Sequence, residues 1–225
     1  NIITRQHKQE GRRTQARVMF GSYNTQKYMI NNGYNIGNFS SFVSVNHDRS
    51  DGHRPDSKFD ITNGFANLGY RINNQYKVTG NLSLAKYNTE DPGAITSPLL
   101  DHIMHILRGT TSFALENHHE KSSGALRVFY NWGHHKINDG HAVNADPRSF
   151  LFYSDDHNTG VQLYQSFRLV EGNTFTAGVD YKNWGGHAWN DTINGPVGEI
   201  VKKSVNEVAG YAIMQQDLFD ILSLN

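Results

Sequence analysis

The chain of 225 residues contains no cysteine. Disulfide bonds, cysteine-ligated zinc sites and iron–sulfur clusters are therefore excluded, although this absence leaves the cellular compartment open. No apolar run reaches the length of about 18 residues that a transmembrane helix needs. The 21 basic and 21 acidic residues balance, and a formal net charge of zero creates no overall field that would attract nucleic acid.

The clearest pattern lies in residues 160–185, where two alternating segments flank a polar turn at 171–173. Apolar side chains occupy the odd positions from Val161 to Leu169 apart from Gln165, and alternation resumes from Phe175 to Tyr181. Strand side chains point alternately to opposite faces, so this hairpin has one apolar and one polar face. A tilted strand of about 9–11 residues crosses the hydrocarbon layer of a membrane. The hairpin alone therefore fits either a membrane barrel or a water-exposed β-sandwich.

The same alternation recurs along the whole chain. Besides the hairpin, it predicts strands at about 14–22, 26–36, 39–47, 58–71, 76–87, 108–117, 124–135 and 204–216, with one more beginning near Ile221. Short turns are expected at 37–38, 72–75, 118–122, 171–173 and 217–220. Long loops are expected at 48–57, 88–107, 136–158 and 185–203, with a helical turn near 99–106.

The alternation of short and long connections decides between the two architectures. In an antiparallel meander it places every short turn at one end of the sheet and every long loop at the other, as in outer-membrane barrels. Sandwich strands are shorter, about 5–6 residues on average. The predicted fold class is therefore all-β, an antiparallel up-and-down transmembrane β-barrel portion of about ten strands.

Several segments of the chain are similar in sequence to segments of a known protein family. They are NIITR (1–5), GSYNT (21–25), NHDRSDGHR (46–54), YNTEDPGA (87–94), TSFALEN (111–117), FYNWGHHKINDG (129–140), DYKNWGG (180–186) and VNEVAGYAIMQQDL (205–218). In this order they resemble TonB-dependent outer-membrane receptors, and are most similar to Bacteroidetes-type receptors for siderophores, haem or cobalamin. The resemblance covers nearly the whole chain.

The resemblance implies a division of the chain. Residues 1–12 correspond to the end of a plug domain and its link to the barrel, and residues 13–225 to the first half of a barrel of about 22 strands. The plug itself and the second half of the barrel are expected outside this sequence.

The implied function is binding and import of a scarce nutrient complex, a ferric siderophore, haem or cobalamin, at the bacterial outer membrane. The expected partners are that small molecule, outer-membrane lipid, and TonB through the missing plug region. No cofactor and no nucleic-acid partner are expected. A passive porin-like channel and a soluble β-rich ligand-binding module remain as alternatives.

The sequence contains no motif of an enzyme or of a metal site. GxSxG, P-loop and GxGxxG patterns are absent, so we expect no catalytic residues. The histidine pairs at 118–119 and 134–135 lack the i, i+4 spacing of a zinc helix. The acidic loop with Asp48, Asp51 and Asp56 misses the spacing of a calcium-binding EF-hand, so no metal site is expected.

Ligand contacts are predicted at the long-loop ends of the strands. Tyr87 and Trp184 have the parity of the polar face and should face inward just below their loops. Further ligand-binding candidates in the predicted loops and at their borders are His134, Tyr153, His187 and Trp189. By contrast, Trp132 and Tyr181 have the apolar parity near the same rim, so they are predicted to anchor the chain at the membrane interface.

Overall fold

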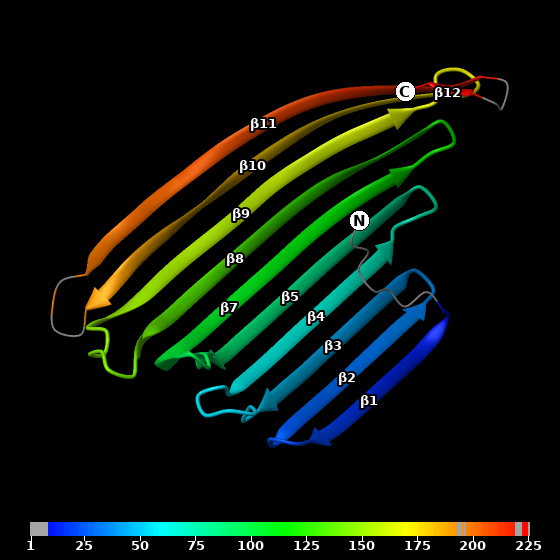
Figure 1. The fold of residues 1–225 in the computed structure, drawn as a ribbon. Helices are drawn as coiled ribbons and strands as arrows, with labels where there is room; N and C mark the ends of the chain where they lie inside the picture. Colours follow the sequence, from blue (N-terminus) through cyan, green and yellow to red (C-terminus); the bar gives the residue numbers. More distant parts are fainter. Residues whose placement is uncertain (1–8, 193–194, 196, 219–221, 225) are drawn as a thin grey trace.

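The computed structural model describes residues 9–192, 195, 197–218 and 222–224, and most of them lie in one antiparallel sheet (Figure 1). The strands are β1 (Gly11–Gly21), β2 (Thr25–Ile36), β3 (Phe39–Ser50), β4 (Phe59–Arg71), β5 (Tyr76–Glu90), β6 (Gly93–Ala94), β7 (Ser97–His118), β8 (Ser122–Ala142), β9 (Phe150–Phe167), β10 (Asn173–Thr192), β11 (Gly198–Leu218) and β12 (Leu222–Leu224). No helix in these ranges is long and apolar enough to cross a membrane.

The strands follow one another in space as they do in the sequence. Their order is β1-β2-β3-β4-β5-β7-β8-β9-β10-β11-β12, and the short β6 pairs with β7. Every pairing is antiparallel. The predicted all-β, up-and-down barrel portion is therefore confirmed.

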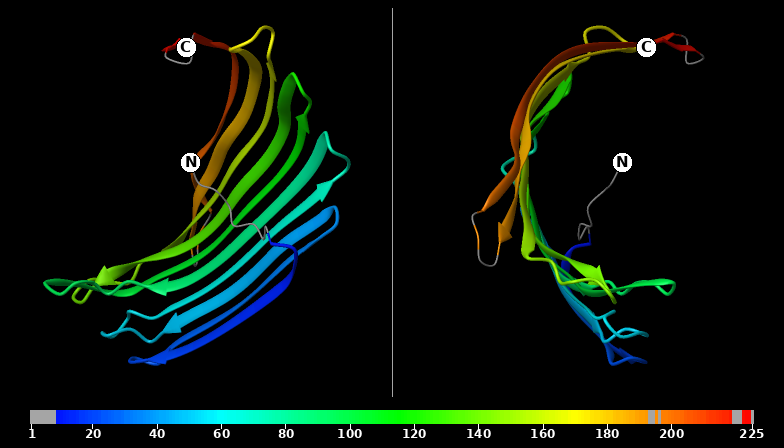
Figure 2. Two further views of the ribbon diagram at one scale, coloured as in Figure 1. Left: turned by 90° about the vertical axis from the view of Figure 1, so that its right-hand side faces the viewer. Right: turned by 60° about the vertical axis from the view of Figure 1, so that its left-hand side comes forward.

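The sheet is strongly curved but does not close on itself (Figure 2). In the described part of the chain, β1 pairs with β2 alone, and β11 pairs with β10 and β12. The first strand thus does not pair with the strand at 204–216, which agrees with the expectation that the chain is a portion of a larger barrel. Residues 1–8 of the segment expected to end the plug and link it to the barrel (1–12), and the strand start at Ile221, lie outside the described residues.

The connections alternate between the two ends of the sheet. Those at 37–38, 72–75, 119–121 and 168–172 lie at one end, called the turn end here. Those at 22–24, 51–58, 91–96 and 143–149, and the one between Thr192 and Gly198, lie at the opposite end, called the loop end. The predicted separation of the two sets of connections is confirmed.

The predicted extents of the long loops are wrong, because most of those residues continue the strands. β5 runs to Glu90 and β7 begins at Ser97, while β8 runs to Ala142 and β9 begins at Phe150. The helical turn expected at 99–106 is also strand. The physical reason is that these extensions have polar side chains on both parities, so alternation disappears while backbone pairing continues.

The register collects the apolar positions of all strands on one face, called the outer face. Residues directly opposite one another across neighbouring strands form a row on the same side of the sheet. One row in the middle of the outer face runs across the strands as Arg12, Tyr34, Ser41, Leu68, Gly80, Phe113, Val128, Val161, Tyr181 and Val208. The parity predicted from the sequence thus holds from β1 to β10.

The opposite, inner face carries most of the buried side chains. Asn31, Asn67, Thr79 and the apolar Phe42 and Ala125 are buried on this parity. By contrast, apolar side chains of the outer face, such as Leu163 and Val179, are more than half exposed. Side chains converge on the concave side of a curved wall and diverge on its convex side. The inner face is therefore the concave one.

The contrast in polarity between the two faces is lost toward the loop end. The outer face gains charged and imidazole side chains there, including Lys86, His105, His134, Lys136, Asp155 and Lys202. The inner face gains apolar side chains beside its polar ones, including Phe59, Ile61, Met104, Ile106, Ile137 and Phe152. The apolar surface of the outer face is thus a belt that ends before the strands do.

Trp132 lies at this upper edge of the belt and packs on its neighbour Gly109. The two residues are opposite in register, and a Cβ atom at position 109 would lie 2.4 Å from the indole ring. A glycine is required here because the ring occupies the space of a side chain. Gly64 lies in the same row, and a Cβ atom at that position would have no other atom within 4 Å.

We predict that Gly109→Ala displaces the Trp132 indole and destabilises the fold by about 1–3 kcal/mol, the usual cost of overpacking. Gly64→Ala is the matched control and should be neutral or slightly stabilising, because it only restricts the unfolded chain. Thermal unfolding followed by tryptophan fluorescence measures both. Equal midpoints for the two variants would contradict the packing role of Gly109.

Candidate functional site

The loop end of the inner face carries a charged network that spans three strands. Arg108 on β7 donates from Nη2 to Asp156 Oδ1 on β9 over a distance of 2.8 Å. Gly133 of β8 lies between them, and a Cβ there would approach the Asp156 carboxylate to 2.5 Å and the Arg108 guanidinium to 3.1 Å. The absent side chain at position 133 therefore lets the ion pair form across β8.

His135 completes this network and its tautomer follows from its partners. Arg108 Nη1 lies 3.1 Å from His135 Nε2, and His135 Nδ1 lies 2.9 Å from Ser154 Oγ. A guanidinium only donates hydrogen bonds, so Nε2 must be the unprotonated acceptor and Nδ1 carries the hydrogen. The network thus requires a neutral imidazole.

The pKa of His135 agrees with that requirement. The residue lies beyond the apolar belt, three positions past Trp132. Burial lowers the pKa of its imidazole below the ordinary value, and the Arg108 guanidinium acts in the same direction. The Asp156 carboxylate, 3.8 Å from Nε2, opposes the lowering without overcoming it. The neutral form is therefore favoured around neutral pH.

Two predicted ligand-binding residues flank this network on the inner face. Tyr87 lies in the row of His135, with Ile106 between them, at roughly 10 Å for two strand spacings. Trp184 lies opposite Asn158, two positions along β9 from Asp156, and its indole donates to Glu207 Oε1 over 3.0 Å. Both have the inward parity predicted from the sequence.

The other four ligand-binding candidates are brought together, but on the outer face. Tyr153 and Trp189 stack with their planes 8° apart and their centroids at 5.5 Å, and His187 stacks on Trp189 at 4.6 Å. The ring centroids of His134 and Tyr153 are 6.3 Å apart, and the His134 imidazole forms a hydrogen bond with the Asp155 carboxylate. All four are strand residues, so their assignment to loops or to the end of a strand is corrected.

The predicted interface residues also lie on the outer face. Trp132 marks the upper edge of the belt, and Tyr181 donates from its hydroxyl to Asn206 Oδ1 over 2.9 Å. Among the described residues, no group of three histidine, cysteine or acidic side chains is arranged to hold a metal ion.

Arg108, His135, Ser154 and Asp156 were not predicted from the sequence as site residues. The contacts of Arg108 join positions 27 to 48 apart along the chain, and all four residues fall in or next to segments expected to be loops. The only available signal was inward parity, which becomes informative once the strands are known to extend through 136–158.

The inner rim combines convergent polar groups with an apolar surround. Ile106, Ile137 and Phe152 lie beside the Arg108–His135–Asp156 network in the adjacent rows. A few placed polar groups within an apolar surround are typical of sites that bind small molecules. The arrangement can hold a polar or charged ligand by hydrogen bonds and stacking.

Solved structures share this fold, although no protein-family model and no curated protein sequence matches the chain. The copper transporter OprC is 14% identical with a TM-score of 0.69, over 92% of this chain and 34% of its own. The RagAB peptide importer in the 'closed-closed' state is 14% identical with a TM-score of 0.50. The match covers 85% of this chain and 29% of that structure's chain. The chain therefore spans about a third of the length of these structures, and has the fold of that part of them.

We predict that the fold loses stability as the pH falls below about 6.5, the pKa of an unfolded-state histidine. Because the folded protein holds His135 neutral, the unfolded chain binds the proton more readily. The stability contributed by His135 is therefore complete above that pH, and is lost as the pH falls toward the lowered folded-state pKa. Thermal unfolding between pH 7.5 and 5 measures the loss.

His135→Gln is the control for this pH dependence. A glutamine amide offers both an acceptor and a donor without titrating, so this variant should show a smaller loss between pH 7.5 and 5. An identical pH profile for the variant and the original chain would contradict the role of His135.

Proposed function

We propose that this chain forms part of the barrel wall of a TonB-dependent receptor in the bacterial outer membrane. The observation that carries the proposal is the apolar belt on the outer face. On β5 the belt runs from Tyr76 to Leu84, which is roughly 27 Å along the strand. At the usual tilt of about 35–45° its height is about 20 Å, which accounts for most of the apolar band of about 25 Å in outer-membrane barrels.

The nutrient-importing role is supported by the concave face rather than by the belt. A wall whose lumen side is polar and carries a ligand-type site at the loop end suits capture of a molecule from outside. We propose a scarce nutrient complex as the cargo, a ferric siderophore, haem or cobalamin. TonB would act through a plug region, which is not part of the described strands.

The proposed contact surface is the inner rim around the Arg108–His135–Asp156 network. Arg108 would pair with an anionic group of the nutrient, since guanidinium–carboxylate contacts are among the strong hydrogen bonds. Tyr87 and Trp184 would pack against its flat or apolar parts. The stack of Tyr153, Trp189 and His187 faces outward, so its proposed part is to join β9 and β10 above the belt.

We predict that Trp184→Ala or Tyr87→Ala in the full-length protein weakens nutrient binding by about tenfold or more, without lowering the yield of folded protein. Binding is measured by titration with ferric siderophores, haem and cobalamin. Trp132→Ala is the matched control, because it removes the same kind of ring from the outer face and should disturb membrane insertion instead.

The alternative of a passive channel gives a different result. Such a channel would bind none of these nutrients tightly, and the variants Tyr87→Ala and Trp184→Ala would leave its permeability unchanged. If all three variants bind such a nutrient with equal affinity, the assignment of the inner rim as the binding site is contradicted.

A further inference from the structure

Three basic side chains lie close together on the outer face, directly above the apolar belt at the loop end. They are Lys86 on β5, His105 on β7 and Lys136 on β8, called the basic triangle here. His105 is directly opposite Lys136 in the register and diagonal to Lys86. Such neighbours have Cβ atoms about 4.5–5.5 Å and about 7–8 Å apart, so the three side chains can contact one anion.

The basic triangle borders the belt. Leu107 lies directly opposite Lys86, and Leu84 lies two positions from Lys86 along β5. Both leucine side chains are exposed on the outer face. In the proposed function, on which this site depends, the belt faces lipid. Acyl chains then contact Leu84, and the basic triangle lies at the level of the headgroups.

The two lysines of the basic triangle have no carboxylate directly opposite them. Their neighbours across the strands are Thr62 and Leu107 for Lys86, and His105 and Tyr153 for Lys136. The Lys136 ammonium lies 5.7 Å from the centre of the Tyr153 ring, a contact that leaves its positive charge in place.

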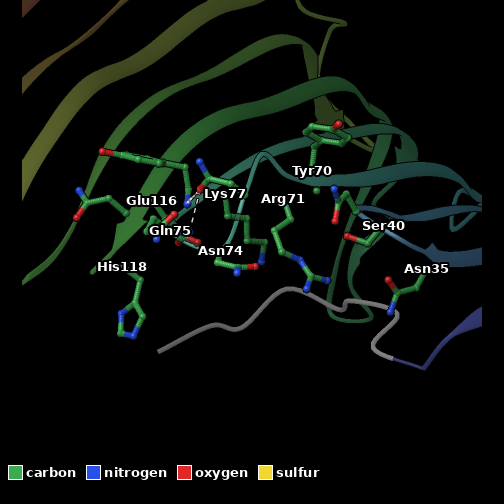
Figure 3. Close-up of a pocket in the computed structure, with 14 residues that line it drawn as sticks. Asn35, Ser40, Tyr70, Arg71, Asn74, Gln75, Lys77, Glu116 and His118 are labelled. Carbon is green, nitrogen blue, oxygen red and sulfur yellow. Dashed lines mark hydrogen bonds between the residues drawn. The ribbon is translucent and has the colours of Figure 1, made fainter. Parts of the chain in front are cut away.

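Lysines of the inner face are paired differently. Lys77 lies directly opposite Glu116, and both residues line a polar pocket at the turn end (Figure 3). Lys182 likewise lies directly opposite Glu207. A carboxylate on the neighbouring strand therefore compensates each of these inner charges, whereas the strands beside the basic triangle place none in that position.

The carboxylates diagonal to the basic triangle already have other partners. They are Asp60, Glu90 and Asp155. Their partners are the His47 imidazole at 3.8 Å, the Lys58 backbone N–H at 3.2 Å and the His134 imidazole, respectively. Among the residues that the structure describes, neither Lys86 nor Lys136 forms an ion pair.

Asn88 adds a neutral donor to the basic triangle. Its Oδ1 atom lies 2.8 Å from His105 Nδ1. A carbonyl oxygen only accepts hydrogen bonds, so Nδ1 carries the hydrogen and the amide nitrogen of Asn88 is left as a further donor. The surface thus offers two ammonium groups and an amide to an acceptor with several oxygens.

We propose that the basic triangle binds the phosphate group of a lipid headgroup in the outward-facing leaflet. The two ammonium groups, on flexible four-carbon stems, donate charge-assisted hydrogen bonds to the phosphate oxygens. The bound anion also removes the repulsion between the neighbouring basic groups. The acyl chains of the same lipid extend along the belt past Leu84. A phosphomonoester fits this site better than a zwitterionic headgroup, because its charge is not offset by a cation of its own.

Native mass spectrometry of the full-length protein tests this proposal without any nutrient. The protein is inserted into nanodiscs of phosphatidylcholine that contain a small mole fraction of phosphatidic acid, and the lipids that stay bound are identified. Phosphatidic acid presents a phosphomonoester, whereas the phosphate of phosphatidylcholine is paired with its own choline. We expect the bound lipid to be enriched in phosphatidic acid about tenfold over its mole fraction.

Two double variants locate the bound lipid. Replacing both lysines of the basic triangle, Lys86→Gln with Lys136→Gln, should abolish the tenfold enrichment. The matched control is Lys77→Gln with Lys182→Gln, which removes the same charge from the inner face and should retain the enrichment. Lys86→Arg with Lys136→Arg keeps both charges and should also retain it.

The proposal is overturned if the original protein shows no enrichment, or if the outer glutamine pair retains it. Loss of the enrichment in the inner pair as well would also overturn it, because the effect would then follow net charge rather than position. Insertion into the nanodisc reports the proposed membrane location by itself. Failure of the proposed function is therefore distinguishable from failure of the lipid preference.

Discussion

The backbone hydrogen-bond ladder is the interaction on which the rest of this structure depends. Apart from the short β6, each strand from β2 to β11 pairs with a neighbour on both sides, and the pairing continues well beyond the apolar belt. In a membrane an unpaired backbone group costs several kcal/mol, so a wall of this kind has to be continuous. The ladder fixes the register, and the register in turn decides which side chains share a face.

The change in side-chain character above the belt connects the wall to its proposed function. Through the belt the outer face is apolar and the inner face is polar, as a lipid-facing wall around a wet lumen requires. Beyond the belt the outer face carries groups such as Lys136 and His134, while the inner face carries Ile137 and Phe152. Arg108 and Asp156 are both partly exposed at this rim, so a ligand entering the lumen can reach them.

The fold was predictable from the sequence where one face of the strand is uniformly apolar. Alternation between Val161 and Tyr181 identified that hairpin, and the parity placed Tyr87 and Trp184 on the inner face. Alternation failed beyond the belt, where water outside and a mixed lumen surface leave no face uniformly apolar. The Arg108–His135–Asp156 network was therefore missed, because it forms only when three such extensions are brought into register.

Accessibility of single cysteines along β10 tests the central claim, that the outer belt faces lipid and ends before the strands do. A membrane-impermeant maleimide is applied to full-length protein in lipid bilayers, with one cysteine at each position from 174 to 190. We expect protection at odd positions and reaction at even positions up to about Trp184, and reaction at both parities from about His187 onward. Equal reaction of Val179 and Asp180 replacements, or alternation that continues to the end of β10, would contradict the claim.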